Sequence, residues 1–354
     1  MDVLFDIPVI GLLFQLIDYM LQTLPRLAPG ILAGATPIAL GAMAGIMCER
    51  SGVVNIGIEG MMLTGAFAGF AMGSLAVTLF GASDGVTVFG ITLPLLIGVG
   101  AAMLSGLVIA TVFAWLTISV RADQIIAGTI VNIAALGLTS YLNRLIGSEL
   151  DGAGRFDKVQ APEILADLPF VGWIFEMLFD QGPIAMSVIV IVIAMQIMLF
   201  KSRWGLRTRA VGEHPKAADT VGIDVIVLRY RNVIIAGALA GLAGGYLTLE
   251  ATGTFQNGMT AGRGFIALAA MIFGRWTPVG ALAGALIFAA SERFGIAVSL
   301  RPPSGELGDF LSLLPNQFWA ALPYIITIVI LAGVVGRSIP PAAVGRPYQK
   351  ESSS

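Results

Sequence analysis

The chain has 354 residues, of which 56% are hydrophobic and 12% charged, with a net charge of −2 and a mean hydropathy of +0.88. A soluble domain usually carries about 25% charged residues, so a soluble chain of this composition would expose apolar surface and aggregate. The net charge offers no sign of nucleic-acid binding. One cysteine, Cys48, and one histidine, His214, exclude an intramolecular disulfide and leave a metal site without support. The composition therefore indicates an integral membrane protein embedded in a lipid bilayer.

The apolar runs are long and continuous, which predicts helical spans rather than a β-barrel. We expect an all-α, polytopic membrane fold with about 8–10 transmembrane helices and some broken or re-entrant segments. The uncharged run 85–120 would measure about 54 Å as one helix, longer than a hydrocarbon core of roughly 30 Å, so part of it must be loop or re-entrant. The candidate spans are residues 27–48, 53–80, 90–119, 124–144, 183–200, 232–249, 279–291 with extensions, and 318–336.

Residues 1–26 precede the first clear span. Asp2 and Asp6, with no basic residue before the apolar run, argue against a secretory signal peptide. Asp18 and Pro25 interrupt this run and favour a tilted or interfacial segment over a regular first span. We therefore interpret residues 1–26 as an interfacial segment or a first span.

Charge predicts the orientation of the transmembrane domain, residues 27–336. Residues 201–231 are the most basic segment of the chain and should form a cytoplasmic loop, because short loops rich in Lys and Arg stay on that side. Residues 147–181 are acidic and should form an external loop. The tail, residues 337–354, contains basic residues, prolines and a serine-rich end, and is expected to be cytoplasmic and largely disordered.

Within the basic segment, residues 212–223 have the pattern of a short helix. Pro215 suits its first position, where the missing N–H costs nothing, and Gly222 suits a left-handed residue just past its end. Such a helix, with a small apolar face of Ala217, Ala218 and Val221, could dock a soluble partner, or it could be a solvated loop helix. The candidate docking residues are Gly212, Glu213, His214, Pro215, Lys216, Ala217, Ala218, Val221, Gly222 and Ile223.

Two glycine-interrupted segments, residues 49–65 and 253–265, break the helix pattern at membrane depth. Such interruptions in two halves of a chain indicate a binding site near the midplane of the membrane. Irregular backbone there must line a cavity or be covered by protein. The candidate residues of the substrate pathway are Asn55, Gly57, Glu59, Gly60, Phe255, Gln256, Asn257 and Gly264.

Glu59 is a carboxylate within an apolar stretch. A carboxylate at the bilayer centre costs about 2.5–3.5 kcal/mol on insertion scales, so it should face a cavity, a partner such as Asn55 or a backbone break, or lie near a membrane interface. One interpretation is a pathway or hinge residue. The other is a cap that accepts N–H groups at the start of the helix near Gly60. The two interpretations are compatible.

Other polar residues have competing interpretations. Phe255, Gln256 and Asn257 could stack on and hydrogen-bond a polar ring, or they could form a polar loop at the membrane surface. Asn132, in an apolar span, more often joins helices than binds a ligand. No nucleophile, base and orienting group form a set, and no Gly-x-x-x-x-Gly-Lys-Ser/Thr phosphate loop is present, so the sequence does not indicate an enzyme.

Five motifs together resemble a known family. Residues 49–63 read Glu-Arg-Ser-Gly-Val-Val-Asn-Ile-Gly-Ile-Glu-Gly-Met-Met-Leu, and residues 205–218 read Gly-Leu-Arg-Thr-Arg-Ala-Val-Gly-Glu-His-Pro-Lys-Ala-Ala. Supporting matches cover residues 123–132, 137–142 and 264–280. These motifs resemble permease subunits of ATP-binding-cassette (ABC) importers for branched-chain amino acids, ribose and nucleosides, and look closest to the nucleoside, or simple-sugar, branch.

The resemblance implies a bacterial inner-membrane permease that forms the pathway for a nucleoside or related sugar-containing solute. It implies three partners: a cytoplasmic ABC ATPase that binds ATP and Mg²⁺, a second homologous permease and an external substrate-binding lipoprotein. This chain itself would bind no cofactor. Residues 212–223 would be the coupling helix that docks on the ATPase. The cargo stays open among nucleosides, nucleobases and sugars, because the lipoprotein does most of the selecting.

A transporter of another class is the main alternative. An ion-gradient-driven secondary transporter also uses broken helices, and it would use Glu59 as its coupling site without partner subunits. A membrane scaffold that transports nothing would explain the helix packing but not two broken segments at depth. Dependence on an ATPase or on an ion gradient separates the two transporter classes.

Overall fold

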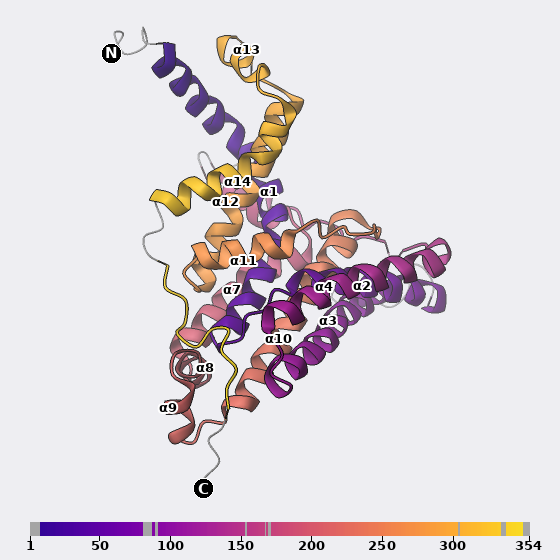
Figure 1. The fold of residues 1–354 in the computed structure, drawn as a ribbon. Coiled ribbons are helices and arrows are strands. Elements are labelled where there is room, and N and C mark those ends of the chain that lie inside the picture. Colours follow the sequence, from indigo (N-terminus) through magenta and orange to yellow (C-terminus); the bar gives the residue numbers. More distant parts are fainter. Residues whose placement is uncertain are drawn as a thin grey trace. The chain divides into compact units, whose positions relative to one another are not determined.

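The computed structural model describes residues 8–80, 87–88, 91–152, 154–166, 168, 171–303, 305–333 and 338–349, and Figure 1 shows that these are almost entirely helical. Several residues named or implied in the predictions for the two termini lie outside these ranges: Asp2, Asp6, Arg337, Lys350 and the serine-rich end. The α-helices are α1 (Pro8–Glu49), α2 (Ile58–Phe80), α3 (Leu93–Ala114), α4 (Gln124–Ile146), α5 (Glu163–Ala166), α6 (Gly172–Phe179), α7 (Pro183–Lys201), α8 (Arg203–Glu213), α9 (Pro215–Thr220), α10 (Val225–Tyr246), α11 (Arg263–Phe273), α12 (Pro278–Leu300), α13 (Glu306–Ser312) and α14 (Asn316–Gly333). π-Helical turns follow α3 (η2, Trp115–Ser119) and α10 (η4, Leu247–Thr252), and a 3₁₀ turn follows α4 (η3, Gly147–Glu149).

The predicted spans overlap these helices, although residues 53–57 of the second span are not helical and residues 334–336 of the last lie outside the described residues. Seven helical segments in the described part of the chain are long and apolar enough to cross a membrane: α1, α2, α3 with η2, α4 with η3, α7, α10 with η4, and α12. The last predicted span falls on α14, which contains Pro323. The run 85–120 is not a single helix, because the antiparallel pair β1 (Thr87–Val88) and β2 (Ile91–Thr92) precedes α3. The protein is a multi-pass, all-α membrane protein.

The chain divides into two compact units. The first comprises residues 1–35, 158–181 and 286–336, and the second comprises residues 36–157, 182–285 and 337–354. In the first unit, Val298, Leu307, Leu311 and Trp319 form a buried cluster. The ring of Tyr19 packs edge-on against Phe294 at its border, with 5.9 Å between ring centroids. The beginning of α1 is therefore fixed against the end of α12 by aromatic packing.

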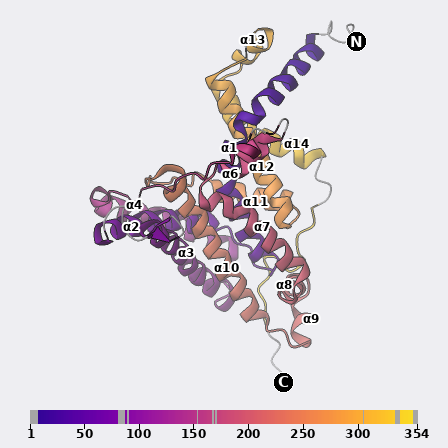
Figure 2. The same cartoon turned by 180° about the vertical axis from the view of Figure 1, so that it is seen from behind.

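The second unit is built around α2, α3 and α10, which lie side by side in both views (Figures 1 and 2). Small residues recur every four positions on the buried face of α3, at Gly98, Ala102, Gly106 and Ala110. A Cβ atom added at Gly106 would overlap the carbonyl oxygen of Gly237 on α10. In lipid, helices associate through close packing rather than hydrophobic burial, so these small residues allow α3 and α10 to approach backbone to backbone.

We expect Gly106→Leu to destabilise the protein by about 1–3 kcal/mol or more, because a well-packed contact has no room for added methylenes. The matched control is Gly100→Leu on the same helix, where an added Cβ meets nothing within 4 Å. The unfolding temperature of each purified variant in detergent is the measurement. Equal unfolding temperatures for the two variants would contradict the proposed role of the α3–α10 contact.

Candidate functional site

Each predicted break contains a non-helical stretch, residues 50–57 within 49–65 and residues 253–262 within 253–265. The first separates the end of α1 at Glu49 from the start of α2 at Ile58, and residues 50–57 contain turns and irregular backbone. The second separates η4, which ends at Thr252, from α11, which begins at Arg263. The breaks belong to the same compact unit, so their geometry can be described together.

The carboxylate of Glu59 joins the two breaks. Its Oε1 accepts a hydrogen bond from the backbone N–H of Gly262 at 2.8 Å, and its Oε2 accepts one from Gly264 at 2.6 Å, although these residues lie more than 200 positions away in sequence. The two N–H groups belong to the first turn of α11, where a negative charge also interacts favourably with the helix dipole. A Cβ at Gly264 would lie 2.7 Å from the Cα of Glu59, so only glycine allows this approach.

Glu59 therefore acts as a helix cap, but on a different helix from the one expected. The predicted cap was on α2, the helix that contains Glu59; the structure places the carboxylate on α11. The physical reason is that a side chain in the first turn of α2 can reach a neighbouring helix end once the backbones are in contact through Gly264.

Two amide side chains on α4 hold the first break. The Oε1 of Gln124 accepts from the N–H of Val54 at 2.7 Å. Asn132 accepts from the N–H of Gly60 at 2.8 Å and donates to the carbonyl oxygen of Ile56 at 3.0 Å. Asn132 thus joins two segments of the protein, as predicted, and supplies partners to backbone groups that the break leaves without helical bonds.

The small residues of the first break lie inside the protein. Asn55 is fully buried, and its Nδ2 lies 3.6 Å from the sulfur atoms of both Cys48 and Met61. Gly57 is also buried. Its backbone nitrogen lies so close to α4 that a Cβ atom added at Gly128 would be 2.8 Å from it. α4 lies against Gly57 and Gly60, and Asn55 is enclosed by Cys48 and Met61, so the place of these three residues in a substrate pathway stays a prediction.

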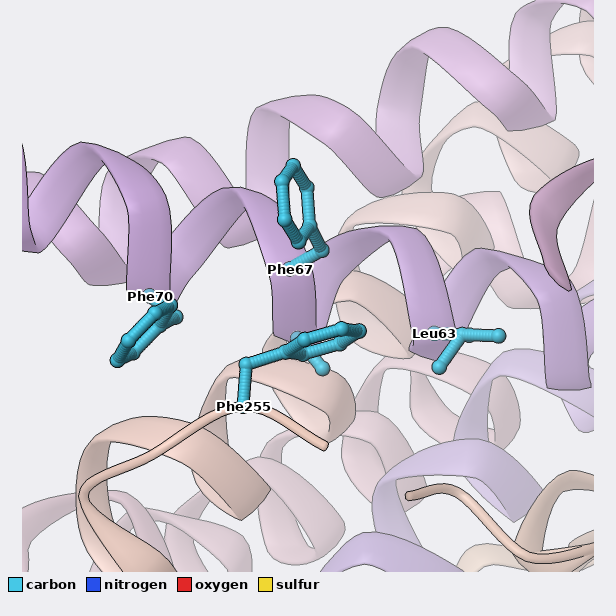
Figure 3. Close-up of a cluster of buried hydrophobic side chains, with 5 residues drawn as sticks. Leu63, Phe67, Phe70 and Phe255 are labelled. Carbon is cyan, nitrogen blue, oxygen red and sulfur yellow. The ribbon is translucent and has the colours of Figure 1, made fainter. Parts of the chain in front are cut away.

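The predicted stacking face of Phe255 is occupied. Its ring is 8% exposed and packs edge-on against Phe67, with 5.1 Å between ring centroids. Figure 3 shows the ring lying against the part of α2 that carries Leu63, Phe67 and Phe70. The adjacent Gln256 and Asn257 are exposed, and Asn257 accepts a hydrogen bond from Asn143 at 3.1 Å. Of the three residues, only the two amides could contact a solute in this conformation.

A second carboxylate that caps a helix, Glu250 in η4, is buried and was not identified from the sequence. Its two oxygens accept from the N–H groups of Ile184 at 2.7 Å and Ala185 at 3.1 Å, so it caps the start of α7 as Glu59 caps α11. Gly182 makes room for it, because a Cβ at that position would overlap the carboxylate. The sequence pattern that could have identified Glu250 is the one that identified Glu59: a lone carboxylate next to a long apolar run.

The turn between α11 and α12 is held by the end of α1. Arg275 and Trp276 both have positive φ, at 51° and 52°, which is strained for residues with a side chain. Arg50 donates to the carbonyl oxygens of both residues, and the indole N–H of Trp276 donates to Glu49 at 2.6 Å. Burial lowers the pKa of Arg50, and the nearby carboxylate of Glu213 opposes that shift.

The basic segment folds into α8 and α9. Pro215 is the first residue of α9 and Gly222 has a φ of 83° just beyond its end, as predicted. The expected apolar face is wrong in one member. Ala218 is buried against Val211, Val225, Leu228 and Tyr348, because neighbouring positions on a helix point in different directions. Ala217 stays exposed, and so does Val221, which is 74% exposed.

The described part of the C-terminal tail, residues 338–349, is ordered against α8 and α9, so the expectation of a largely disordered tail is wrong there. We call these residues the C-terminal segment. Backbone N–H groups of Ala343 and Gly345 donate to the carbonyl oxygens of Gly212 and Gly52, at 2.9 and 3.3 Å. Tyr348 is buried among the apolar residues of α8, α9 and α10. The buried aromatic ring and the backbone bonds explain the order.

A family model described as "Branched-chain amino acid transport system / permease component" matches residues 27–331. The chain belongs to this family. It is 38% identical over 335 residues to the guanosine ABC transporter permease protein NupQ of Bacillus subtilis (strain 168), covering 93% of this chain and 98% of that protein. It is 34% identical to the nucleoside ABC transporter permease protein NupC of Lactococcus lactis subsp. cremoris (strain MG1363), with the same two coverages.

A third relative, the guanosine ABC transporter permease protein NupP of Bacillus subtilis (strain 168), is 29% identical over 78% of this chain and 73% of its own length. No solved structure matches the chain. The family predicted from the motifs is thereby confirmed, and the protein is a multi-pass transport component of the inner membrane. In this permease, hydrogen bonds from Glu59 and from side chains of α4 stabilise the ends of the broken helices.

We expect Glu59→Gln to lower the stability of the permease by about 1–3 kcal/mol, because an amide offers one acceptor where the carboxylate offers two and its NH₂ group meets an N–H donor. The unfolding temperature in detergent measures the effect. Glu149→Gln, at an exposed glutamate, is the control and should leave that temperature unchanged. Equal stability of both variants would show that the bonds to α11 contribute nothing.

Proposed function

We propose that this permease is one of two transmembrane subunits of an ABC importer for nucleosides and forms part of their pathway across the inner membrane. The similarity over 93% of the chain to permeases named for guanosine and for nucleosides carries the proposal. Related sugar-containing solutes are the next candidates for the cargo, because a bound ribose offers the same hydroxyl groups. The pathway is uncharged at Gln256 and Asn257, which suits a neutral, polar solute.

The proposed transporter contains further subunits. An ABC ATPase on the cytoplasmic side binds and hydrolyses ATP with Mg²⁺, and an external lipoprotein binds the cargo and delivers it near residues 147–181. A second, homologous permease completes the pathway. The similarity of this chain to both NupQ and NupP, two permeases of one organism named for the same cargo, supports a pair of homologous permeases.

Residues 212–223 serve as the coupling helix in this proposal. Three features support that role: the surrounding basic charge, the exposure of Ala217 and Val221 at the end of α9, and the firm attachment of α9 to the rest of its unit through Ala218. ATP-driven closure of the ATPase would move α9 and rock the spans between outward-open and inward-open states. The broken segments would then be the places where the helices change their packing.

Uptake of radiolabelled guanosine tests the cargo. Cells that lack their own nucleoside uptake should accumulate guanosine when this permease is expressed with its partner subunits, and excess unlabelled nucleoside should compete. Uptake of the label that excess glucose reduces, but excess unlabelled nucleoside does not, would contradict the nucleoside assignment. Uptake that persists without the ATPase and collapses with the ion gradient would instead support the secondary-transporter alternative.

We expect Val221→Asp to abolish most transport while the protein still inserts in the membrane, because a charge on the exposed apolar end of α9 would have to be desolvated at the ATPase surface. The matched control is Leu206→Asp on α8, at another exposed apolar side chain of the basic segment. Uptake and retention of the ATPase after detergent extraction are the measurements. Normal uptake by the Val221 variant would contradict the docking role of α9.

A further inference from the structure

The coupling helix borders a cleft that its proposed role does not explain. The cleft has a volume of about 920 Å³. One side is formed by residues 213–217, at the end of α8 and the start of α9, and the other by Ala342, Ala343 and residues 346–349 of the C-terminal segment. All of these residues belong to the same compact unit.

The C-terminal segment forms a fixed wall of this cleft. The N–H of Ala342 donates to the Glu213 carboxylate at 3.1 Å, and the guanidinium of Arg229 donates to the carbonyl oxygen of Arg346 at 3.1 Å. Tyr348 anchors the far end in the apolar cluster beneath α9. Because these bonds add to the backbone bonds at Gly52 and Gly212, the wall and α9 are held as one surface.

α9 by itself is too small to hold a partner. It has six residues, and its exposed apolar surface is limited to Ala217 and the adjoining Val221. A stable protein interface buries about 800 Å² on each partner and uses about 20–30 residues a side. A docking surface that depends on α9 therefore needs additional area, and the cleft and its C-terminal wall are continuous with it.

The charges of the cleft indicate what it would accept. Among the described residues that line it, Lys216 and Arg346 are basic and Glu213 is acidic, and the Glu213 carboxylate accepts a hydrogen bond from the wall. Complementary charge favours a partner surface with acidic side chains. We propose that the C-terminal segment is the second half of the ATPase docking surface, and that its cleft receives a protruding acidic segment of that subunit. This inference rests on the proposed function.

Cysteine labelling tests the proposal in the assembled transporter. Cys48 is fully buried, so thiol reagents should report on introduced cysteines. Gln349→Cys lies in the cleft, Ile339→Cys lies in the same segment outside the cleft and is 79% exposed, and Val221→Cys marks α9. Maleimide labelling of inside-out vesicles is compared with the ATPase bound and after its removal with urea. We expect the ATPase to slow labelling severalfold at positions 349 and 221 and to leave position 339 unchanged.

The other outcomes separate the two proposals. Protection at position 221 without protection at 349 would overturn the cleft proposal and leave the coupling role of α9 intact. Labelling that is unaffected at both positions would overturn docking at α9 as well. A charge test is independent of labelling: Arg346→Glu should lower retention of the ATPase severalfold, whereas Arg346→Lys should retain it. Equal retention by these two variants would overturn the acidic-segment assignment.

Discussion

Irregular backbone inside a membrane must find all of its hydrogen-bond partners within the protein, and that constraint shapes this permease. The first break takes its partners from α4, through the amide groups of Gln124 and Asn132. The start of α11, beyond the second break, takes two partners from the carboxylate of Glu59, in the first turn of α2 just beyond the first break. The start of α11 is therefore not satisfied by its own segment, and a displacement of the first turn of α2 would deprive it of these bonds. Glu250 meets the same requirement at the start of α7.

Small residues make those bonds possible. A glutamate or asparagine reaches a neighbouring helix end only when the two backbones lie close together, and in lipid that closeness has to come from packing. Gly264 allows the backbone of α11 to contact that of Glu59, and Gly128 allows α4 to contact the first break. At these two positions glycine is therefore needed so that polar side chains can reach backbone groups. At Gly106 it is needed for the α3–α10 contact. Glycine thus allows both the hydrogen bonds at helix ends and the close packing of helices, which explains why it is abundant in this helical chain.

The sequence predicted the features that depend on local pattern. Apolar length located the spans, and Pro215 and Gly222 marked the ends of α9, because these residues act through their own backbone geometry. It could not predict which helix Glu59 caps, which way the Phe255 ring points or where the C-terminal segment binds. Each of those depends on contact between segments far apart in the chain. Ala218 shows the same limit of prediction from sequence within one short helix. Its apolar side chain is compatible with an exposed docking face and with the buried position that it takes.

The contacts around Gly212 connect α9 to the broken helices. A Cβ at Gly212 would overlap the carbonyl oxygen of Arg50, so α8 lies directly on the first residue after α1. Arg229 joins the same region to the C-terminal segment by donating to Ser51 and Arg346. Most of these bonds involve backbone atoms, which cannot rotate away as side chains can, so the cluster should move as one body. Under the proposed function, a displacement of α9 would therefore pass through residues 50–57 to Glu59. There both hydrogen bonds to α11 come from one side chain, so a change of the Glu59 rotamer would release them without unfolding either helix.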